Sequence, residues 1–206
     1  MKIFLNNISK KYSSGFTLKD INYEFNTGNI YGISGTNGCG KSTLLKIIAS
    51  MELPDSGKIN YFNCNSPIYD RQINKYLSVV APYSEVSDYF TLEESIDFHF
   101  SFKSYQKNFD KNKVIDMLNM RHISKQMIGT FSSGMKQKLK LVLAMYSDSP
   151  LVLLDEPAMN LDGDSIDMFQ TLIKDFSKNR LILIFSNNRS EELSLCNKLI
   201  TTEFFR

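Results

Sequence analysis

A glycine-rich segment that ends in Lys and Ser lies between a strand-like run at residues 30–34 and a helix-like run at residues 43–49. The segment fits the pattern GxxxxGK[ST], and its residues are Gly35, Thr36, Asn37, Gly38, Cys39, Gly40, Lys41 and Ser42. Glycines allow successive backbone N–H groups to turn toward one phosphate chain, and the N-terminus of the following helix adds a favourable dipole. In this context the segment predicts the phosphate-binding loop of a nucleotide site.

Two side chains of this loop suit the chemistry of a bound nucleotide. Lys41 should reach the β- and γ-phosphates, and Ser42 supplies a hydroxyl that can ligate Mg²⁺ beside the terminal phosphates. Thr43 begins the helix-like run and is included among the nucleotide-binding candidates. The alternative is a glycine-rich turn before an ordinary helix, but such a turn requires neither Lys and Ser at these positions nor an acidic partner downstream.

An acidic pair follows a second apolar run, at residues 151–154. The four apolar residues predict a strand buried on both faces, so Asp155 and Glu156 lie at its carboxyl end, where open α/β sheets bind their ligands. Asp155 is placed to hold Mg²⁺ directly or through water, and Glu156 is placed to polarise the attacking water. The pair could instead cap a helix or be solvated, but its combination with the phosphate loop favours the catalytic interpretation.

Composition favours one compact domain over residues 1–206 and names no macromolecular ligand. The chain is 42% hydrophobic and 22% charged, and its formal net charge of +2 is too small to indicate a nucleic-acid or membrane-surface partner. The three cysteines have neither paired spacing nor a nearby His, which argues against disulfides or zinc and favours a reducing cytosol. No apolar run approaches the ~18 residues of a membrane span, so another chain would have to supply one.

The order of the apolar runs predicts an α/β fold that begins with an antiparallel β layer. Residues 2–8 and 17–25 alternate apolar and polar side chains as half-exposed strands do, with Ser13, Ser14 and Gly15 as the turn between them. Further strand-like runs alternate with helical stretches, which indicates a mainly parallel sheet flanked by helices. These runs are residues 30–34, 58–62, 77–81, 151–154 and 181–185.

Residues 83–146 carry helical patterns only, so we predict a helical lobe inserted in a catalytic core of residues 1–82 and 147–206. Thr91 and Glu94 form a capping box at the start of an aromatic-rich helix. The aromatic residues of this helix are Phe98, Phe100 and Phe102. Their stripe is expected to be part of the core and not a ligand site.

With these features, the chain resembles the ATP-binding cassette (ABC) family over nearly its whole length and in the family's order. It is similar to the nucleotide-binding subunit of ABC transporters, which implies a P-loop NTPase core that binds ATP and Mg²⁺. Tyr12 stands where the family has an aromatic residue that stacks on adenine, a few residues after the first strand. Such stacking gives affinity without much base specificity. The alternative is an exposed tyrosine at a strand end.

Residues 131–135, Phe-Ser-Ser-Gly-Met, match the family's signature Leu-Ser-Gly-Gly-Gln in the central serine and the second glycine. The resemblance implies that Ser132 and the backbone N–H groups of Ser133 and Gly134 contact a phosphate of the ATP that the other protomer holds. Without the family, the same segment is a helix start capped by a serine. Asp162 lies in a segment that looks like the family's dimer-contact loop, and a plain helix cap is the alternative.

Two positions depart from the family where its members sense the γ-phosphate or the attacking water. Tyr83 stands in place of a glutamine, and its hydroxyl can bond a water but cannot offer an amide carbonyl to Mg²⁺. Asn187 stands in place of a histidine, and its amide can donate to a phosphate oxygen but carries no positive charge. Since Glu156 and Lys41 are present, we predict an ATPase that turns over slowly.

The resemblance implies two chains that dimerise head to tail around ATP and separate after hydrolysis. The expected partners are a second copy or a second cassette and a membrane permease supplied by another chain, with no nucleic acid. The expected location is the cytoplasm, at the inner face of the membrane through that permease. Two alternatives stay open: a soluble ABC ATPase that acts on ribosomes or DNA, and an ATP-dependent dimer switch with little hydrolysis. The altered signature, Tyr83 and Asn187 favour the switch.

Overall fold

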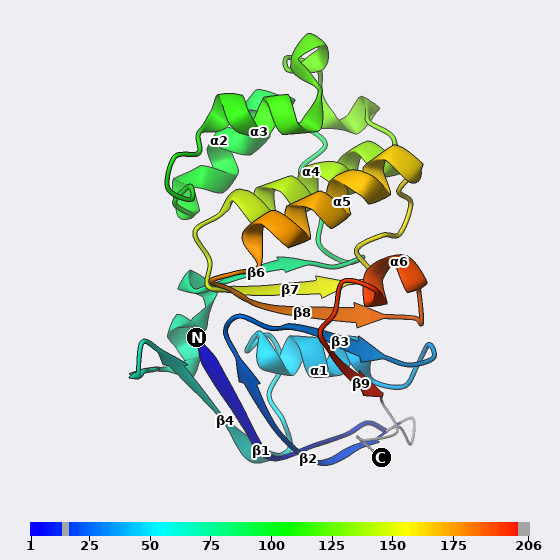
Figure 1. The fold of residues 1–206 in the computed structure, drawn as a ribbon. Helices are drawn as coiled ribbons and strands as arrows, with labels where there is room; N and C mark the ends of the chain where they lie inside the picture. The colour runs from blue at the N-terminus through cyan, green and yellow to red at the C-terminus, as the bar shows by residue number, and fades with distance from the viewer. Residues whose placement is uncertain (14–16, 202–206) are drawn as a thin grey trace.

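Two β-sheets and the helices around them make up the protein in a computed structural model that describes residues 1–13 and 17–201 (Figure 1). The antiparallel sheet has the strand order β2-β1-β4-β5, and the parallel sheet has the order β6-β7-β8-β3-β9. The antiparallel strands are β1 (Lys2–Lys11), β2 (Thr17–Asn26), β4 (Ser56–Asn63) and β5 (Ser66–Ile68). The parallel strands are β3 (Ile30–Ser34), β6 (Leu77–Val80), β7 (Leu151–Asp155), β8 (Leu181–Ser186) and β9 (Lys198–Thr201).

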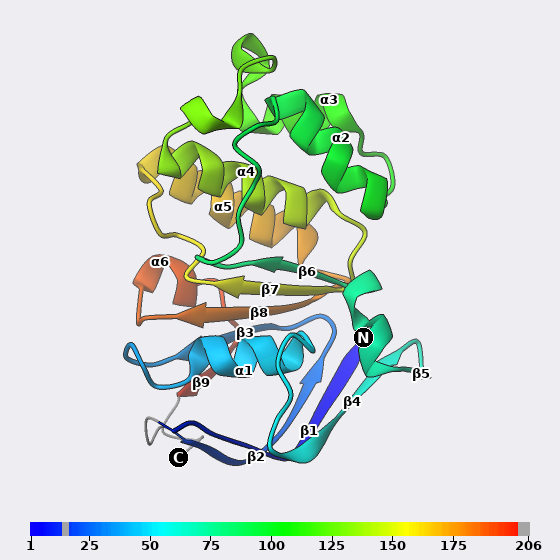
Figure 2. The same cartoon turned by 180° about the vertical axis from the view of Figure 1, so that it is seen from behind.

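Helices lie on both faces of the parallel sheet. Figures 1 and 2 show α1 between the two sheets, whereas α4 and α5 cover the opposite face of β6, β7 and β8. The α-helices are α1 (Lys41–Ile48), α2 (Leu92–Phe102), α3 (Lys111–Leu118), α4 (Ser133–Tyr146), α5 (Gly163–Phe176) and α6 (Ser190–Leu193). Short 3₁₀ turns are η1 (Asp70–Lys75), η2 (Arg121–Ile123) and η3 (Ile128–Thr130). Every residue of β7 and β8 is buried, as expected of central parallel strands covered on both faces.

The predicted α/β fold with an amino-terminal antiparallel layer is confirmed, with one correction. The run at residues 58–62 was expected in the parallel sheet, but it belongs to β4, which pairs antiparallel with β1 through registers such as Leu5 with Ile59. An apolar run of this length does not say which sheet it joins, because pairing depends on the path of the chain. The short strands β5 and β9 were not predicted. The expected turn at Ser13, Ser14 and Gly15 lies partly outside the described residues.

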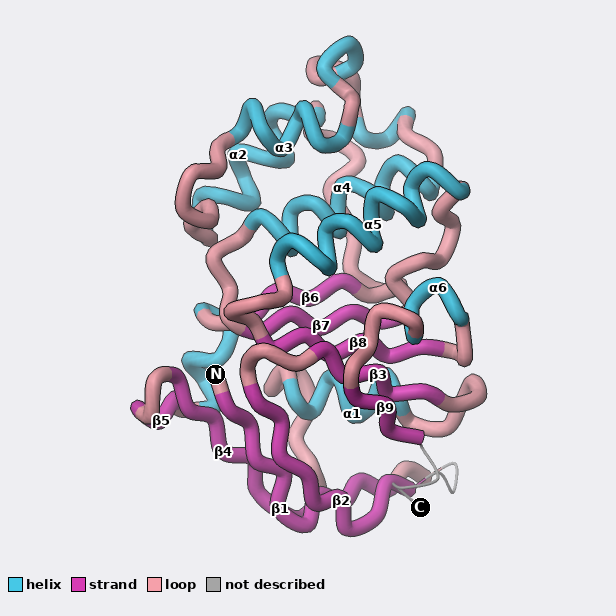
Figure 3. Tube along the Cα trace, viewed as in Figure 1, coloured by secondary structure: helices cyan, strands magenta, loops and turns pink. Residues whose placement is uncertain are grey.

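Between β6 and β7 the chain forms helices and loops, and α2 and α3 lie above the layer of α4 and α5 (Figure 3). The capping box at α2 is confirmed, because the Glu94 N–H donates to Thr91 Oγ1 (3.2 Å) and the Thr91 N–H donates to Glu94 Oε2 (2.8 Å). The expectation that the aromatic stripe is core is wrong for Phe98 and Phe102, which are 54% and 75% exposed. Their spacing of one helical turn lets the two rings contact each other at the surface, with centroids 5.2 Å apart.

Among the described residues, no helix has both the length and the apolar character needed to cross a membrane.

Candidate nucleotide-binding site

The phosphate loop connects β3 to α1 and folds around its own lysine. Gly38 and Gly40 have φ angles of +80° and +102°, which a residue with a Cβ adopts only with strain. The buried ammonium of Lys41 donates hydrogen bonds to the carbonyl oxygens of Gly35 (2.7 Å) and Thr36 (3.0 Å). These bonds hold the loop in a compact turn at the N-terminus of α1. Local bonds between the loop and Lys41 therefore form the turn, and the positive end of the α1 dipole directly follows it.

The acidic strand meets the phosphate loop at the carboxyl end of β7. The Ser42 hydroxyl donates to Asp155 Oδ2 at 2.6 Å, although the two residues are far apart in the sequence. Asp155 is only 2% exposed. Burial raises the pKa of Asp155, while the Ser42 hydrogen bond and the charges of Lys41 and Lys46 oppose that increase. The structure thus brings together the two predicted metal ligands, and it adds Lys46, which the motif did not indicate.

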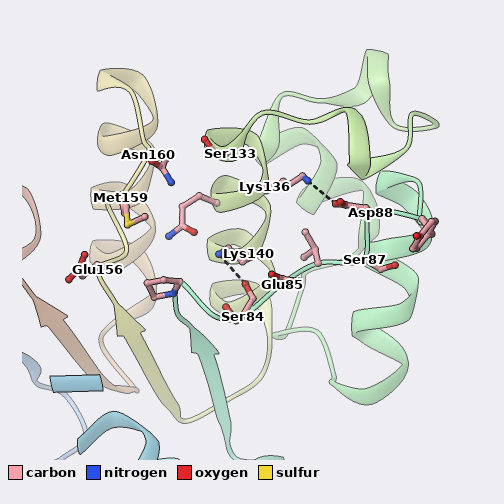
Figure 4. A pocket seen from close by; sticks show the side chains of 14 residues that line it. Ser84, Glu85, Ser87, Asp88, Ser133, Lys136, Lys140, Glu156, Met159 and Asn160 are labelled. Atoms are coloured by element: carbon pink, nitrogen blue, oxygen red, sulfur yellow. Dashed lines mark hydrogen bonds and ion pairs between the residues drawn. The ribbon is translucent and has the colours of Figure 1, made fainter. Parts of the chain in front are cut away.

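Glu156 leaves the strand with a left-handed backbone, at φ +48°. Its N–H donates to the Phe185 carbonyl of β8 (2.8 Å), so the backbone is still bonded to the sheet while the chain turns away. The side chain is half-buried. In Figure 4, Glu156 lies at one side of a cavity of about 650 Å³, opposite the loop that follows β6. A carboxylate at the rim of an open cavity can contact water, as a general base requires.

Cationic side chains of α4 connect this cavity to the loop after β6. The Lys140 ammonium donates to the carbonyl oxygens of Ala81 (3.3 Å) and Ser84 (3.2 Å). Figure 4 shows the bond with Ser84 and the Lys136 ammonium, which contacts Asp88 at 2.7 Å. Burial lowers the pKa of Lys140. These bonds cross from the predicted helical lobe to the segment that begins it.

Tyr12 directly follows β1 and lies beside the first turn of α1. Its hydroxyl donates to the Glu52 carboxylate, and the Lys10 ammonium lies 5.8 Å from the centre of its ring. Burial raises the pKa of Tyr12, and a hydrogen bond with Thr43 opposes the increase. The half-buried ring is therefore held next to the phosphate loop by its hydroxyl. Stacking on adenine stays a prediction, and Glu52 is a partner that the sequence did not reveal.

The signature segment and Asp162 both act as helix caps within one chain. The Ser132 hydroxyl accepts a hydrogen bond from the Met135 N–H (3.2 Å) at the start of α4, and the Asp162 carboxylate accepts one from the Ser165 N–H (3.0 Å) at the start of α5. The two loops also touch, because a Cβ added to Gly134 would lie 2.8 Å from the carbonyl oxygen of Asn160. Phosphate contacts of Ser132, Ser133 and Gly134 across a dimer stay predictions.

The two positions that depart from the family lie at different edges of the site. Tyr83 is 44% exposed, and the Lys46 ammonium lies 4.9 Å from its ring centre. Burial and the nearby Asp155 raise the pKa of Tyr83 to about 12, so its hydroxyl stays a hydrogen-bond donor at neutral pH. Asn187 directly follows β8 and is exposed. The structure places Tyr83 near the predicted metal ligand, and its pairing with Lys46 was not predicted.

A buried carboxyl group behind the site was also missed. Glu192 in α6 is fully buried, and its Oε1 accepts a hydrogen bond from the Ala158 N–H (2.9 Å) in the loop that follows Glu156. Burial raises the pKa of Glu192, the carboxylate of Glu156 adds to the increase, and Arg189 and the hydroxyl of Ser186 oppose it. No sequence motif indicates this residue, because its burial depends on the three-dimensional fold.

Replacing Glu192 with Gln is expected to make the protein more stable at pH 8. With its pKa raised, folded Glu192 holds its proton at pH values where the unfolded chain has lost it. The free energy of unfolding therefore falls as the pH rises from the ordinary glutamate value to the folded one. Gln cannot ionise, so the variant should lack this fall. Urea unfolding at pH 5 and pH 8 measures the effect, and the same pH dependence in both proteins would contradict it.

Comparisons with known proteins agree with this geometry. The family model for ABC transporters matches residues 18–159. The chain is 34% identical to the energy-coupling factor transporter ATP-binding protein EcfA1 of Thermotoga maritima, over 84% of this chain and 67% of that protein. It is 29% identical to the bacitracin transport ATP-binding protein BcrA of Bacillus licheniformis, over 86% of this chain and 58% of that protein.

The comparisons also bear on the length and the fold. The ABC transporter ATP-binding protein YcbN of Bacillus subtilis is 30% identical over 86% of this chain, which spans 59% of that relative. The chain thus spans about three fifths of YcbN and BcrA. A putative ABC transporter ATP-binding protein from Pyrococcus furiosus has the same fold, with a TM-score of 0.81 at 22% identity, over 100% of this chain and 99% of that one. The chain belongs to the ABC transporter family.

Proposed function

We propose that this chain is the ATP-hydrolysing subunit of a membrane transporter. The observation that carries the proposal is the contact between Ser42 and Asp155, which joins the phosphate loop to the acidic strand at one point. A nucleotide bound by the loop would place its terminal phosphates beside Asp155 and Glu156. The relatives named as ATP-binding proteins of transporters support the same reading.

The residues at this point fit Mg²⁺. Asp155 and Ser42 offer a carboxylate and a hydroxyl oxygen, the hard ligands that Mg²⁺ takes when phosphates and waters complete its coordination. The burial of Asp155 disfavours its charge, and a cation beside it would offset that cost. When bound, Mg²⁺ would neutralise charge on the terminal phosphates. The assignment of Asp155 and Ser42 as its ligands is part of the proposal.

Three side chains would carry the hydrolysis. Glu156 would accept a proton from the attacking water, and Lys41 would move from the loop carbonyls to the β- and γ-phosphates. Asn187 would donate a hydrogen bond to a phosphate oxygen. Because Asn187 lacks a positive charge and Tyr83 lacks an amide carbonyl, we propose slow turnover.

The proposal includes a head-to-tail dimer and a membrane partner. In the dimer, the Ser132 loop of one chain would complete the nucleotide site of the other, and ATP would shift the population toward closure. A dimeric post-hydrolysis state with ADP and phosphate is known for a cassette of similar fold, with a TM-score of 0.80 at 20% identity over 97% of this chain and 93% of that one. The helical lobe at residues 83–146 would transmit the motion to a permease at the inner face of the membrane.

Steady-state Mg²⁺-ATP hydrolysis by the purified chain, measured over a range of protein concentrations, tests the proposal. A homodimeric ATPase should show specific activity that rises with concentration, because each site needs the partner's Ser132 loop. Activity proportional to concentration throughout would reject the dimer, and turnover at the level of a Glu156→Gln variant would reject hydrolysis by this chain alone.

An ATP-dependent dimer switch is the second candidate, and Tyr83 and Asn187 favour it. Size-exclusion chromatography with ATP and with ADP distinguishes the two functions. A switch predicts a wild-type dimer that persists for hours in Mg²⁺-ATP with little phosphate release. A motor predicts a wild-type dimer that dissociates as ATP is consumed.

Replacing Asn187 with His is expected to raise turnover by about tenfold. A histidine can place positive charge near the developing charge on the γ-phosphate, and loss of one preorganised donor in such a position typically costs about a hundredfold or more. Asn187 retains part of that interaction, so the expected gain is smaller. Phosphate release at saturating ATP measures it, with Asn188→His as the control for a neighbouring exposed position. An unchanged rate in Asn187→His would show that this position does not limit hydrolysis.

A further inference from the structure

We propose that Glu192 is a positioning residue that holds the loop carrying Glu156 through the backbone N–H of Ala158. The inference rests on the proposed role of Glu156 as the base. It concerns a side chain outside the nucleotide-binding motifs, on the short helix α6 that follows β8.

Glu192 and Arg189, which lie three residues apart, bond the N–H and the carbonyl of Ala158 respectively. The Ala158 N–H donates to Glu192 Oε1 at 2.9 Å, and the Arg189 guanidinium donates to the Ala158 carbonyl at 2.9 Å. Ala158 is itself buried, so water cannot replace these partners without opening the loop. The Arg189 guanidinium is charged, and hydrogen bonds of a charged group are stronger than those between neutral groups.

The residues immediately before Ala158 are anchored to other parts of the site. The Glu156 N–H donates to the Phe185 carbonyl at 2.8 Å, and the Gln137 amide of α4 donates to the Pro157 carbonyl at 2.9 Å. Three consecutive residues are thus bonded to β8, α4 and α6 in turn. Glu192 bonds the last of the three, Ala158, which lies two residues after the proposed base Glu156.

The placement of Glu192 is costly, which points to a role beyond packing. Its side chain is fully buried, and its bonding partners are the Ala158 N–H and the Ser186 hydroxyl. Burying a carboxyl group costs more than burying an apolar group, so an apolar side chain would fit this position at lower cost. A carboxylate oxygen, unlike an apolar group, can accept the Ala158 N–H and so determine where the loop lies.

The bonds of Glu192 and Arg189 to Ala158 also connect two loops of the site. Arg189 lies two residues after Asn187, and its own N–H donates to the Ser186 hydroxyl at 3.1 Å. The loop with Asn187 and the loop with Glu156 are therefore joined by Arg189 and Glu192. Removing Glu192 should loosen the proposed base relative to the proposed phosphate contact while leaving the phosphate loop intact.

Hydrogen exchange and kinetics of Glu192→Ala, Glu192→Gln and Glu191→Ala test the inference. Glu191 is the matched control, because its carboxylate accepts from the Ser190 hydroxyl and has no bond to Ala158. In Glu192→Ala we expect exchange of the Ala158 amide to become about tenfold faster, which is the loss of one hydrogen bond of about 1.4 kcal/mol. We expect kcat to fall about tenfold with KM for ATP within about twofold. Glu192→Gln should restore both within about threefold, because its amide carbonyl can accept the same N–H.

The outcomes separate this inference from the proposed function. Unchanged exchange at Ala158 in Glu192→Ala would show that Glu192 does not hold the loop. Faster exchange together with a kcat equal to that of Glu191→Ala would show that holding the loop does not position Glu156. A KM that rises as much as kcat falls would overturn the positioning role too. If wild type and Glu156→Gln have equal turnover, the proposed function fails, and the exchange data still decide whether Glu192 holds the loop. If Glu192→Ala does not fold, Glu192→Met, which fills the same space without a strong acceptor, takes its place, and unchanged exchange and kcat there would overturn the inference.

Discussion

Replacing Glu156 with Gln is expected to lower steady-state ATP hydrolysis by about a hundredfold or more while ATP binding is retained. Gln keeps the shape of the side chain but cannot take a proton from water, and a positioned general base typically contributes about a hundredfold to ten-thousandfold. The backbone should be unaffected, because the contact of residue 156 with β8 is made by its N–H. Phosphate release measures turnover, and titration with a fluorescent ATP analogue measures binding.

The same variant should trap the ATP-bound dimer, since closure would no longer be followed by hydrolysis. Glu24→Gln on β2 is a suitable control, because it removes one exposed carboxylate far from the motifs in the sequence. Turnover in Glu156→Gln equal to that of wild type would mean that another group activates the water.

The second large effect is expected from Lys41→Ala, which should weaken ATP binding by about a hundredfold. The ammonium now bonded to Gly35 and Thr36 would reach the phosphates, and each hydrogen bond to a charged group contributes about 1.5–3 kcal/mol. Loss of one or two such bonds corresponds to about one to four powers of ten in affinity. Isothermal titration with Mg²⁺-ATP measures the dissociation constant.

Lys41 also bonds two carbonyl oxygens of the loop, so its removal acts on the loop as well as on the ligand. Lys19→Ala removes one exposed positive charge from β2 and controls for the change in net charge. Affinity that stays within about twofold of wild type in Lys41→Ala would show that backbone N–H groups supply the binding energy and that the side chain is dispensable.

The elements that the sequence predicted well are those whose signal is local. The strand, glycine loop and helix around Lys41 follow from residue types at adjacent positions, and the cap of α2 follows from Thr91 and Glu94 three residues apart. The buried run before Asp155 identified β7, because a central parallel strand leaves few positions for polar residues. The sequence located Tyr83 and Asn187 along the chain, but it did not reveal which residues lie around them.

Local residue patterns identified the glycine loop, the buried strand before Asp155 and the α/β class, because backbone turns, caps and strand burial depend on neighbouring residues. Contacts between distant segments of the chain were set only by the tertiary packing. Residues 58–62 were placed in the antiparallel sheet by pairing with β1, and Phe98 and Phe102 stay exposed because no described segment buries that side of α2. Lys46 beside Tyr83 and Glu192 beneath Ala158 are contacts between segments distant along the chain. Such contacts depend on how the elements pack, and no local pattern encodes them.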